Sequence, residues 1–460
     1  MAEEPIKAAE SPGDEASLTA GTQPPRLPSA GAANRSLLAL SVEKRTLAAV
    51  VIGVFFVYFF SNPAPWNHFD YTFRIAEAML HGRLGLTEQP PPWLNEMVPF
   101  GNQYYSAFPL GSVLCMLPFA LLKLVHVIRT VPGGLIVALL AAGSAAFFFQ
   151  LSSKLDESLG RRVLLALFPL FATWAWTDVA FAGAVHLAFG FAMLGQAGAL
   201  YFTLIRPRPV IAGLFFATAC GNRTELIVTA PFFIYFLTQS EDRQGKLFPL
   251  PSGLKGKIQG ALERLSEQRR SVARFLIIPA ALGLLTILYN FARFHAFFDS
   301  GYTRIPGLMQ NEAFKGALYS MYSIPRNAQK MLFNLPWRRI DHRPYLVPYG
   351  FGGSIFLSSP LLFLLFRRPR DRNQFRSAWI AIAVLILVLL LQADPGGWQF
   401  AYGLAMLLIP WTFLALLASG GPKLSRWEVA LFSLSVVINA FATYEFLWTH
   451  NVQPQLERYA

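Results

Sequence analysis

Residues 46–71 read TLAAVVIGVFFVYFFSNPAPWNHFDY, an uncharged apolar run followed by a polar turn that ends at Asp70 and Tyr71. Similar runs recur along the chain, since 54% of its 460 residues are hydrophobic and only 14% are charged. Soluble domains carry about 25% charged residues, so this composition predicts a polytopic membrane protein. The runs are continuous, as in Ile380–Leu391, which favours helices over the alternating strands of a barrel.

The formal net charge of +13 comes from short basic runs between apolar segments. Lys and Arg in such loops mark the cytoplasmic side of a membrane, so the basicity requires no nucleic-acid partner. Lys44 and Arg45 therefore predict a cytoplasmic amino terminus. Residues 1–44, rich in Pro, Ala, Gly, Ser and Glu, are expected to form a disordered tail. Cys115 and Cys220 lie in apolar sequence and are interpreted as packing residues.

The same charge rule orders the spans. We take five basic segments as cytoplasmic: Arg161 with Arg162, Arg206 with Arg208, residues 239–274, Arg367 to Arg370, and Lys423 with Arg426. One arrangement then fits, an all-α bundle of about eleven transmembrane helices, two of them short. The expected spans are 46–61, 132–152, 161–177, 181–204, two short helices within 209–238, 273–294, 350–367, 377–392, 398–418 and 427–448.

The transmembrane domain is expected to cover residues 45–450. Its long loops are an external one at 62–131, a cytoplasmic one at 239–272 and an external one at 295–349, and residues 451–460 form an external tail. Within the first loop, Pro109 to Val127 is expected to be an interfacial helix rather than a span, because it contains Pro118, Lys123 and His126.

Asp70 opens the segment Tyr71 to Gly82, whose polar and apolar residues follow helical spacing. Arg74 lies on the polar side of this expected helix. Two interpretations of Asp70 stay open: it caps the helix, or it is a catalytic carboxylate at the outer membrane face.

Asp178 interrupts apolar sequence between Trp176 and Phe181. A carboxylate at membrane depth normally faces a polar cavity or a partner, whereas one at the outer interface is simply solvated or caps the next helix. His186 follows two turns later, either as a hydrogen-bonded core histidine or as part of the same site.

Arg223 and Glu225 separate the two short apolar helices within 209–238. Helices broken at membrane depth are tolerated where they line a cavity, and a guanidinium there suits a phosphate. The alternative is a structural ion pair of Arg223 with Glu225 or Asp178.

Aromatic and basic residues are frequent in the predicted external loops. Trp66, Trp93, Tyr104 and Tyr105 would stack on sugar rings or form an interfacial belt. Basic clusters, one of them around Arg293, would be ordinary solvated loop or would attract an anionic headgroup. The chain has no Gly-rich phosphate loop, no His-Glu-x-x-His pair and no Gly-x-Ser-x-Gly elbow.

These features together resemble the GT-C superfamily of integral membrane glycosyltransferases, which includes protein mannosyltransferases and aminoarabinose transferases, and in particular its uncharacterised bacterial members. The resemblance covers about residues 45–420 and depends on the order of several short stretches. They are Asp70 with YYSAFPLG at 104–111, Asp178, GLFFATACGNR at 213–223, YNFARFHAFFDSGY at 289–302, and GGWQFAY at 396–402. Gly403 stands where related sequences often carry Arg.

The resemblance implies transfer of a sugar from a polyprenyl-phosphate donor at the outer face of the cytoplasmic (inner) membrane, with a lipid, glycan or protein as acceptor. Asp70 would be the general base, or a divalent-metal ligand in members that use one, and Asp178 would assist it. Arg223 would hold the donor phosphate. The other substrate-binding residues would be Arg74, Tyr104, Tyr105, His186, Glu225, Arg293, Tyr302 and Trp398.

Two other classes remain open at this point. A transporter or lipid flippase would line its path with the same buried charges. Long external loops and the lack of a visible internal repeat argue against a carrier. A noncatalytic membrane scaffold would leave the broken helix at Arg223 without a cause.

Overall fold

The computed structural model describes residues 30–63, 69–91, 94, 96–153, 155, 157–238, 266–310, 312–314, 317–370, 372–393 and 396–452. Residues 1–29 of the predicted tail at 1–44 lie outside the described residues. Residues 30–44 form the start of helix α1 (Ala30–Phe60). Most of the predicted cytoplasmic loop at 239–272 and of the C-terminal tail at 451–460 also lies outside it. The chain divides into two units, Met1–Thr46 and Leu47–Ala460.

The second unit is built mainly from helices, with two short antiparallel hairpins. Its α-helices are α2 (Tyr71–Leu80), α3 (Leu110–Leu124), α4 (Gly133–Ser152), α5 (Leu159–Phe171), α6 (Ala175–Ala180), α7 (Ala184–Leu204), α8 (Pro209–Asn222), α9 (Ala230–Thr238), α11 (Arg269–Phe294), α12 (Ser323–Leu332), α13 (Ile355–Ser358), α14 (Arg372–Leu391), α15 (Ile409–Leu417) and α16 (Arg426–Leu447). The longer 3-10 helices are η2 (Thr224–Thr229), η6 (Pro360–Phe366) and η7 (Gly403–Leu408), and shorter ones are η3 (Tyr302–Arg304), η4 (Leu308–Gln310) and η5 (Glu312–Phe314). Strands β1 (Met97–Phe100) and β2 (Gln103–Ser106) form one hairpin, and β3 (Trp337–Arg339) and β4 (Leu346–Pro348) form the other.

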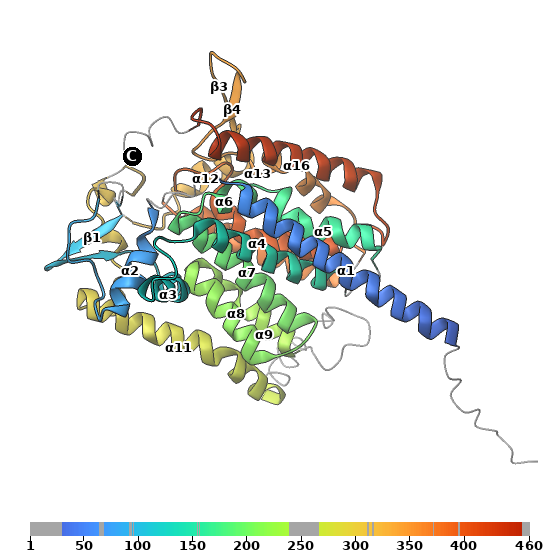
Figure 1. The fold of residues 1–460 in the computed structure, drawn as a ribbon, viewed down its shortest axis with the longest axis horizontal. Helices are drawn as coiled ribbons and strands as arrows, with labels where there is room; N and C mark the ends of the chain where they lie inside the picture. The colour runs from blue at the N-terminus through green and yellow to red at the C-terminus, as the bar shows by residue number, and fades with distance from the viewer. Residues whose placement is uncertain are drawn as a thin grey trace, which may run out of the picture. The chain divides into compact units, whose positions relative to one another are not determined.

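Helix α7 lies inside the helical body. Of its apolar stretch 83% is buried within the protein, against 11% for α11 and 33% for α16. Figure 1 shows α16 along one edge and α11 along the other, with α4, α7 and α8 between them. The described residues therefore leave most of the apolar surface of α11 and of α16 uncovered, as is usual for helices that contact lipid.

The prediction of about eleven transmembrane helices is wrong in number. Within the described ranges, four helices are long and apolar enough to cross a membrane: α4, α7, α11 and α16. The apolar helices of 10–17 residues are Leu110–Leu124, Pro209–Asn222, Thr224–Thr238, Phe375–Leu391 and Gly403–Leu417. The structure is that of an all-α protein compatible with membrane insertion, in which many apolar segments are shorter than a full span.

Breaks inside the apolar runs explain the difference. Helix α5 ends at Phe171, soon after Pro169, and not at residue 177. The run predicted at 350–367 is split between α13 and η6, whose first residue is Pro360. Proline cannot donate the hydrogen bond that would continue a helix. The uncharged part of the first run, residues 46–60, is about 22 Å long at the α-helical rise, against roughly 30 Å of hydrocarbon.

Glycines allow α8 to pack closely against two neighbouring helices. A Cβ atom on Gly213 would collide with the backbone oxygen of Phe275 on α11. One on Gly111 of α3 would collide with the backbone of Gly221 on α8. Small residues let helix backbones approach in this way. The second of these contacts lies at the end of α8, where Arg223 follows directly.

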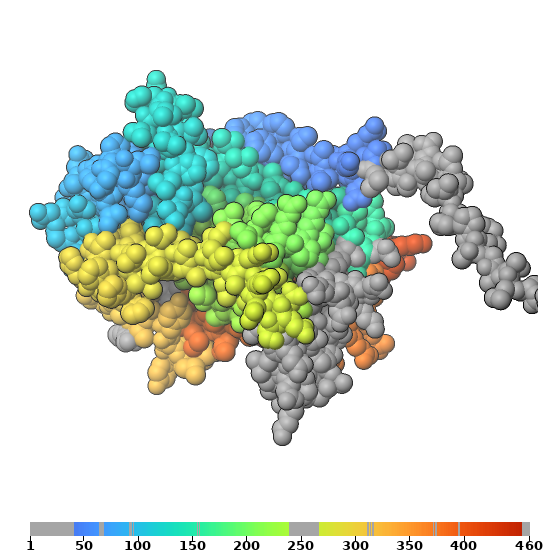
Figure 2. Space-filling view, turned by 90° about the horizontal axis from the view of Figure 1, so that it is seen from below, coloured from blue at the N-terminus to red at the C-terminus, as the bar shows by residue number. Residues whose placement is uncertain are grey.

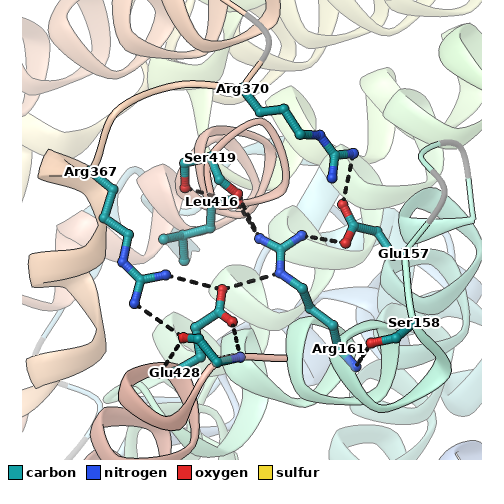
Figure 3. A network of polar contacts seen from close by, with 9 residues as sticks. Glu157, Ser158, Arg161, Arg367, Arg370, Leu416, Ser419 and Glu428 are labelled. Carbon is teal, nitrogen blue, oxygen red and sulfur yellow. Dashed lines mark hydrogen bonds and ion pairs between the residues drawn. The ribbon is translucent and has the colours of Figure 1, made fainter. Parts of the chain in front are cut away.

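Five charged side chains form a cluster at one end of the helices (Figure 3), which we call the charge cluster: Glu157, Arg161, Arg367, Arg370 and Glu428. Arg161 is only 1% exposed and pairs with Glu157 at 2.7 Å and Glu428 at 3.1 Å. Arg367 and Arg370 complete the cluster, at 3.3 Å from Glu428 and 3.0 Å from Glu157 respectively. Arg161 also donates to two backbone carbonyl oxygens, one at the end of α15 and one just after it. A buried arginine would be costly without such partners.

The charge cluster brings together three of the segments that the charge rule assigned to one side of the membrane. They are residues 157–162, 367–370 and 419–428. Their meeting at one end of the helices agrees with the predicted grouping, and their cytoplasmic location stays a prediction.

Substituting Gly213 tests the close contact between α8 and α11. Gly213→Ala should lower the free energy of unfolding by about 1–3 kcal/mol, because the added methyl group must push the two backbones apart. Gly283→Ala on α11 is the matched control, since a Cβ atom there meets nothing within 4 Å. The control should be neutral or slightly stabilising, by at most about 1 kcal/mol. Thermal unfolding of both purified variants in one detergent measures this, and equal melting temperatures would contradict the packing account.

Candidate functional site

The predicted site residues gather at the helix ends opposite the charge cluster. Arg161 lies in the first turn of α5, whereas Asp178 lies on α6, beyond the other end of α5. In the same way, Phe400 precedes η7 and α15, and Ser419 of the charge-cluster end follows them. The two ends of these helices therefore hold different sets of charged residues.

Asp178 is buried, at 3% exposure, on the six-residue helix α6. Its Oδ1 accepts a hydrogen bond of 3.0 Å from the backbone N–H of Phe400, and its Oδ2 is buried with no hydrogen-bond partner among the described residues. Helix α6 lies outside the four long apolar helices. Burial raises the pKa of the Asp178 carboxyl to about 8, against a smaller lowering by the Phe400 N–H. The carboxyl is therefore largely protonated at neutral pH. It is buried, so the interpretation of Asp178 as a solvated interfacial residue is wrong.

His186 lies at the start of α7 and contacts the same loop. Its Nε2 is 3.2 Å from the backbone oxygen of Trp398, and its ring centroid is 4.5 Å from that of Phe181. The Nδ1 atom is buried without a hydrogen-bond partner in the described part of the chain. Trp398 has a φ of +44°, an unusual conformation for a bulky residue, and its indole ring packs on Phe351.

Arg223 lies between α8 and η2, where the apolar run breaks. Its guanidinium stacks on the Phe189 ring, 3.5 Å from the centroid, and Nη2 donates to the backbone oxygen of Val185 at 3.2 Å. Its Nε is buried with no partner among the described residues. Within those residues it forms no ion pair with Glu225 or Asp178, although the Glu225 charge interacts with it at longer range. The alternative of a structural ion pair is thus not supported.

Glu225 is held by a residue that the sequence analysis did not single out. Its Oε1 accepts a hydrogen bond of 2.6 Å from Nε2 of Gln392, at the end of α14. The sequence feature that could have identified this residue is that Gln392, a polar amide residue, directly follows the apolar run of α14. This bond ties the broken helix to the segment leading to Trp398.

Asp70 precedes α2, and its carboxylate accepts a 2.6 Å hydrogen bond from Nε of Arg74, one turn along the helix. No side-chain capping bond is formed by Asp70. Its side chain is 12% exposed and that of Arg74 35%. Burial raises the pKa of the Asp70 carboxyl above its ordinary value, and Arg74 partly offsets this. The carboxylate is thus partly exposed, oriented by Arg74, and more basic than a fully exposed aspartate.

Phe69 connects Asp70 to the Asp178 side of the site. The ring of Phe69 lies 6.2 Å from the ring of Phe181, centroid to centroid. A Cβ atom added to Gly183 would touch both Phe69, at 3.4 Å, and Nδ1 of His186, at 3.2 Å. Asp70, which directly follows Phe69 in the sequence, therefore lies near the residues that surround His186.

The stretch 289–302 joins the end of α11 to the first hairpin. Arg293 is 2% exposed, donates to the backbone oxygen of Ser106 and stacks on Tyr289 at 3.8 Å. Tyr105 packs against Phe294, with ring centroids 5.4 Å apart. In this structure Arg293 and Tyr105 hold the hairpin in place, and their predicted contact with substrate stays untested.

The remaining predicted residues lie around this arrangement. Tyr302 is half-buried in η3 and interacts electrostatically with Arg223. Tyr104, in β2, pairs through its backbone with Leu86. Trp66 and Trp93 lie outside the described residues.

The structure explains why residue 403 is a glycine. Its N–H donates to Oε1 of Gln399 at 2.6 Å, and a Cβ atom at this position would collide with the same oxygen. An arginine at residue 403 would displace Gln399, which here fixes the turn that carries Trp398 and Phe400.

The residues do not fit the divalent metal ion that the resemblance allowed. Asp70 is engaged by Arg74, and one oxygen of Asp178 by the backbone of Phe400. Across the described ranges no three His, Cys, Asp or Glu side chains lie together as a metal-binding group.

Comparisons of this chain with protein-family models, with curated proteins and with solved structures found no match.

The protonation of Asp178 gives a pH test of stability. The folded state holds a proton on Asp178 between about pH 4 and about pH 8, where the unfolded state does not, so wild-type stability should fall as pH rises through this window. Asp178→Asn keeps an oxygen acceptor for the Phe400 N–H and has no proton to lose. The variant should therefore gain thermal stability relative to wild type as the pH is raised. A constant difference in melting temperature across the window would contradict a protonated Asp178.

Proposed function

We propose that this protein is a membrane glycosyltransferase that moves a sugar from a polyprenyl-phosphate donor to an acceptor hydroxyl at the outer face of the cytoplasmic membrane, with its amino terminus inside. In this proposal the protein is a GT-C type enzyme. The donor lipid enters from the membrane, and the acceptor is a lipid, a glycan or a protein.

The observation that carries the proposal is that a buried arginine and a buried aspartate at one end of the helices form no ion pair with the described residues. Within those residues, Arg223 also has a buried Nε without a hydrogen bond, and Asp178 has a buried Oδ2 in the same situation. Buried polar atoms are normally hydrogen-bonded, and a functional site is one explanation for an exception. Asp70, which follows Phe69 in the sequence, adds a partly exposed carboxylate on the Phe181 side.

These residues suit displacement at an anomeric carbon. The Asp70 carboxylate would take the proton of the acceptor hydroxyl while the acceptor oxygen bonds to the anomeric carbon. The bond from that carbon to the phosphate oxygen then breaks, and both of its electrons leave with the polyprenyl phosphate. Arg223 would bind this anion and stabilise its growing charge. Protonated Asp178 would donate a hydrogen bond that orients the sugar or the acceptor.

Two features support a lipid-linked donor in particular. Arg223 stacks on Phe189 at a break between apolar helices, and in this proposal a phosphate carried by a long apolar chain reaches it there. Most of the apolar surface of α11 and of α16 is left uncovered by the described residues. A soluble nucleotide donor would need a polar phosphate-binding loop, for which the sequence has no motif.

Replacing Asp70 tests the proposed base. Asp70→Asn should reduce transfer from a radiolabelled polyprenyl-phosphate-sugar pool by at least about 100-fold, the usual contribution of a general base, without loss of membrane insertion. Glu88→Gln, which removes an exposed carboxylate from the same external region, is the matched control and should retain activity. Wild-type turnover by Asp70→Asn would end this assignment. Uptake of substrate into sealed vesicles without a covalent product would favour a transporter.

Arg223→Lys tests the phosphate contact separately. Lysine keeps the charge but loses the planar, bidentate donor geometry and the stacking on Phe189, so the KM for the lipid donor should rise about tenfold. Arg206→Lys, at an exposed position, should leave the KM unchanged. Steady-state kinetics at varied donor concentration measure both, and an unchanged KM in Arg223→Lys would remove Arg223 from the donor site.

A further inference from the structure

A half-open cavity of about 570 Å³ lies where α2 and α3 end, and Asp70, Arg223 and Asp178 are not among its lining residues. Its polar lining consists of Glu77, His81, Lys123, His126 and Arg129. In Figure 2 the teal part of the chain that includes the end of α3 projects from the surface beside the blue first loop.

The cations of this cavity are only partly neutralised. Nζ of Lys123 pairs with Oε2 of Glu77 at 2.7 Å, which holds the ammonium in the cavity and leaves it further donors. The side chains of His126 and Arg129 are exposed and make no hydrogen bond or ion pair with the described residues. The cavity therefore has an uncompensated guanidinium with five donors, the geometry that matches a phosphate.

Exposed apolar side chains lie close in sequence to Arg129. Val125 is 57% exposed and Val127 66%; they flank His126, and Val127 lies two positions before Arg129. The φ of +61° at His126 ends α3 and turns the chain there. Exposed apolar residues interleaved with cations are typical of a membrane interface, where apolar groups enter the acyl region and cations meet lipid phosphates.

We propose that this cavity binds the phosphate diester of an anionic membrane phospholipid. Arg129 is its bidentate ligand, Lys123 is a second donor positioned by Glu77, and the valines contact the acyl chains. A free phosphate ester has the same charge but cannot use the apolar rim. The proposal can be tested separately from the transfer reaction, because Arg129 is not assigned to that reaction, although the charge of Lys123 also acts on Asp70.

The test measures the binding of phosphatidylglycerol to the full-length protein in detergent, with native mass spectrometry as the readout. Wild type should bind phosphatidylglycerol at least about tenfold more tightly than phosphatidylcholine, and Arg129→Gln should lose about tenfold for phosphatidylglycerol alone, as expected for a charged hydrogen bond. Arg83→Gln is the matched control: it removes the same charge from the same external region, but Arg83 donates to Thr87 and does not line the cavity. Its affinity should equal that of wild type.

Three results would overturn the proposal. One is unchanged phosphatidylglycerol binding in Arg129→Gln, and another is an equal loss in Arg83→Gln, which would indicate nonspecific attraction by net charge. The third is displacement of the lipid by soluble glycerol phosphate at equal concentration, since the lipid chains would then contribute nothing. Both variants remove exposed side chains, so thermal unfolding should confirm that each keeps wild-type stability.

Discussion

The cost of burying charge inside an apolar helical protein governs the arrangement of this molecule. At one end each charge of the charge cluster lies within ion-pair distance of an opposite charge. Arg161 lies between Glu157 and Glu428, and Arg367 and Arg370 each pair with one of these carboxylates. At the other end Arg223 and Asp178 form no ion pair with the described residues, and each keeps a buried polar atom without a hydrogen bond there. The charge cluster thus holds loops together, and the proposed function places its chemistry at the other end.

The short helices connect these two ends to the proposed function. Helix α8 stops at Asn222 and η7 starts at Gly403, so both leave a non-helical backbone beside the site. Through these breaks the backbone N–H of Phe400 reaches Asp178, and the guanidinium of Arg223 reaches Phe189. Continuous spans would have satisfied the same backbone groups within the helices and left no polar positions there.

The sequence was sufficient for the helical class and for several local features. Composition predicted an apolar helical protein, and the basic runs predicted that Arg161, Arg367 and Arg426 belong to loops on one side; the first two meet in one charge cluster. The interruption at Arg223 predicted two short helices, which the structure has as α8 and the pair η2–α9. Such features depend on neighbours in sequence, which is why they could be inferred.

Other features depend on contacts between distant residues and could not be predicted. The hydrogen bond from Phe400 to Asp178 spans 222 positions, and that from Gln392 to Glu225 spans 167. Helix lengths were overestimated because hydropathy does not register a stop such as Pro360 within an apolar run. Arg293 illustrates the same limit, since its pairing with the carbonyl of Ser106 depends on a hairpin far away in sequence.

The central claim is that the helix ends around Arg223, Asp178 and Asp70 form the binding site for a polyprenyl-phosphate-linked sugar. The most direct measurement is a structure of the protein bound to a nonreactive polyprenyl-phosphonate sugar. The account predicts the phosphonate within hydrogen-bond distance of the Arg223 guanidinium and the sugar between Asp70 and Asp178. A phosphonate bound elsewhere, with the Arg223 guanidinium still placed against Val185 and Phe189, would contradict it.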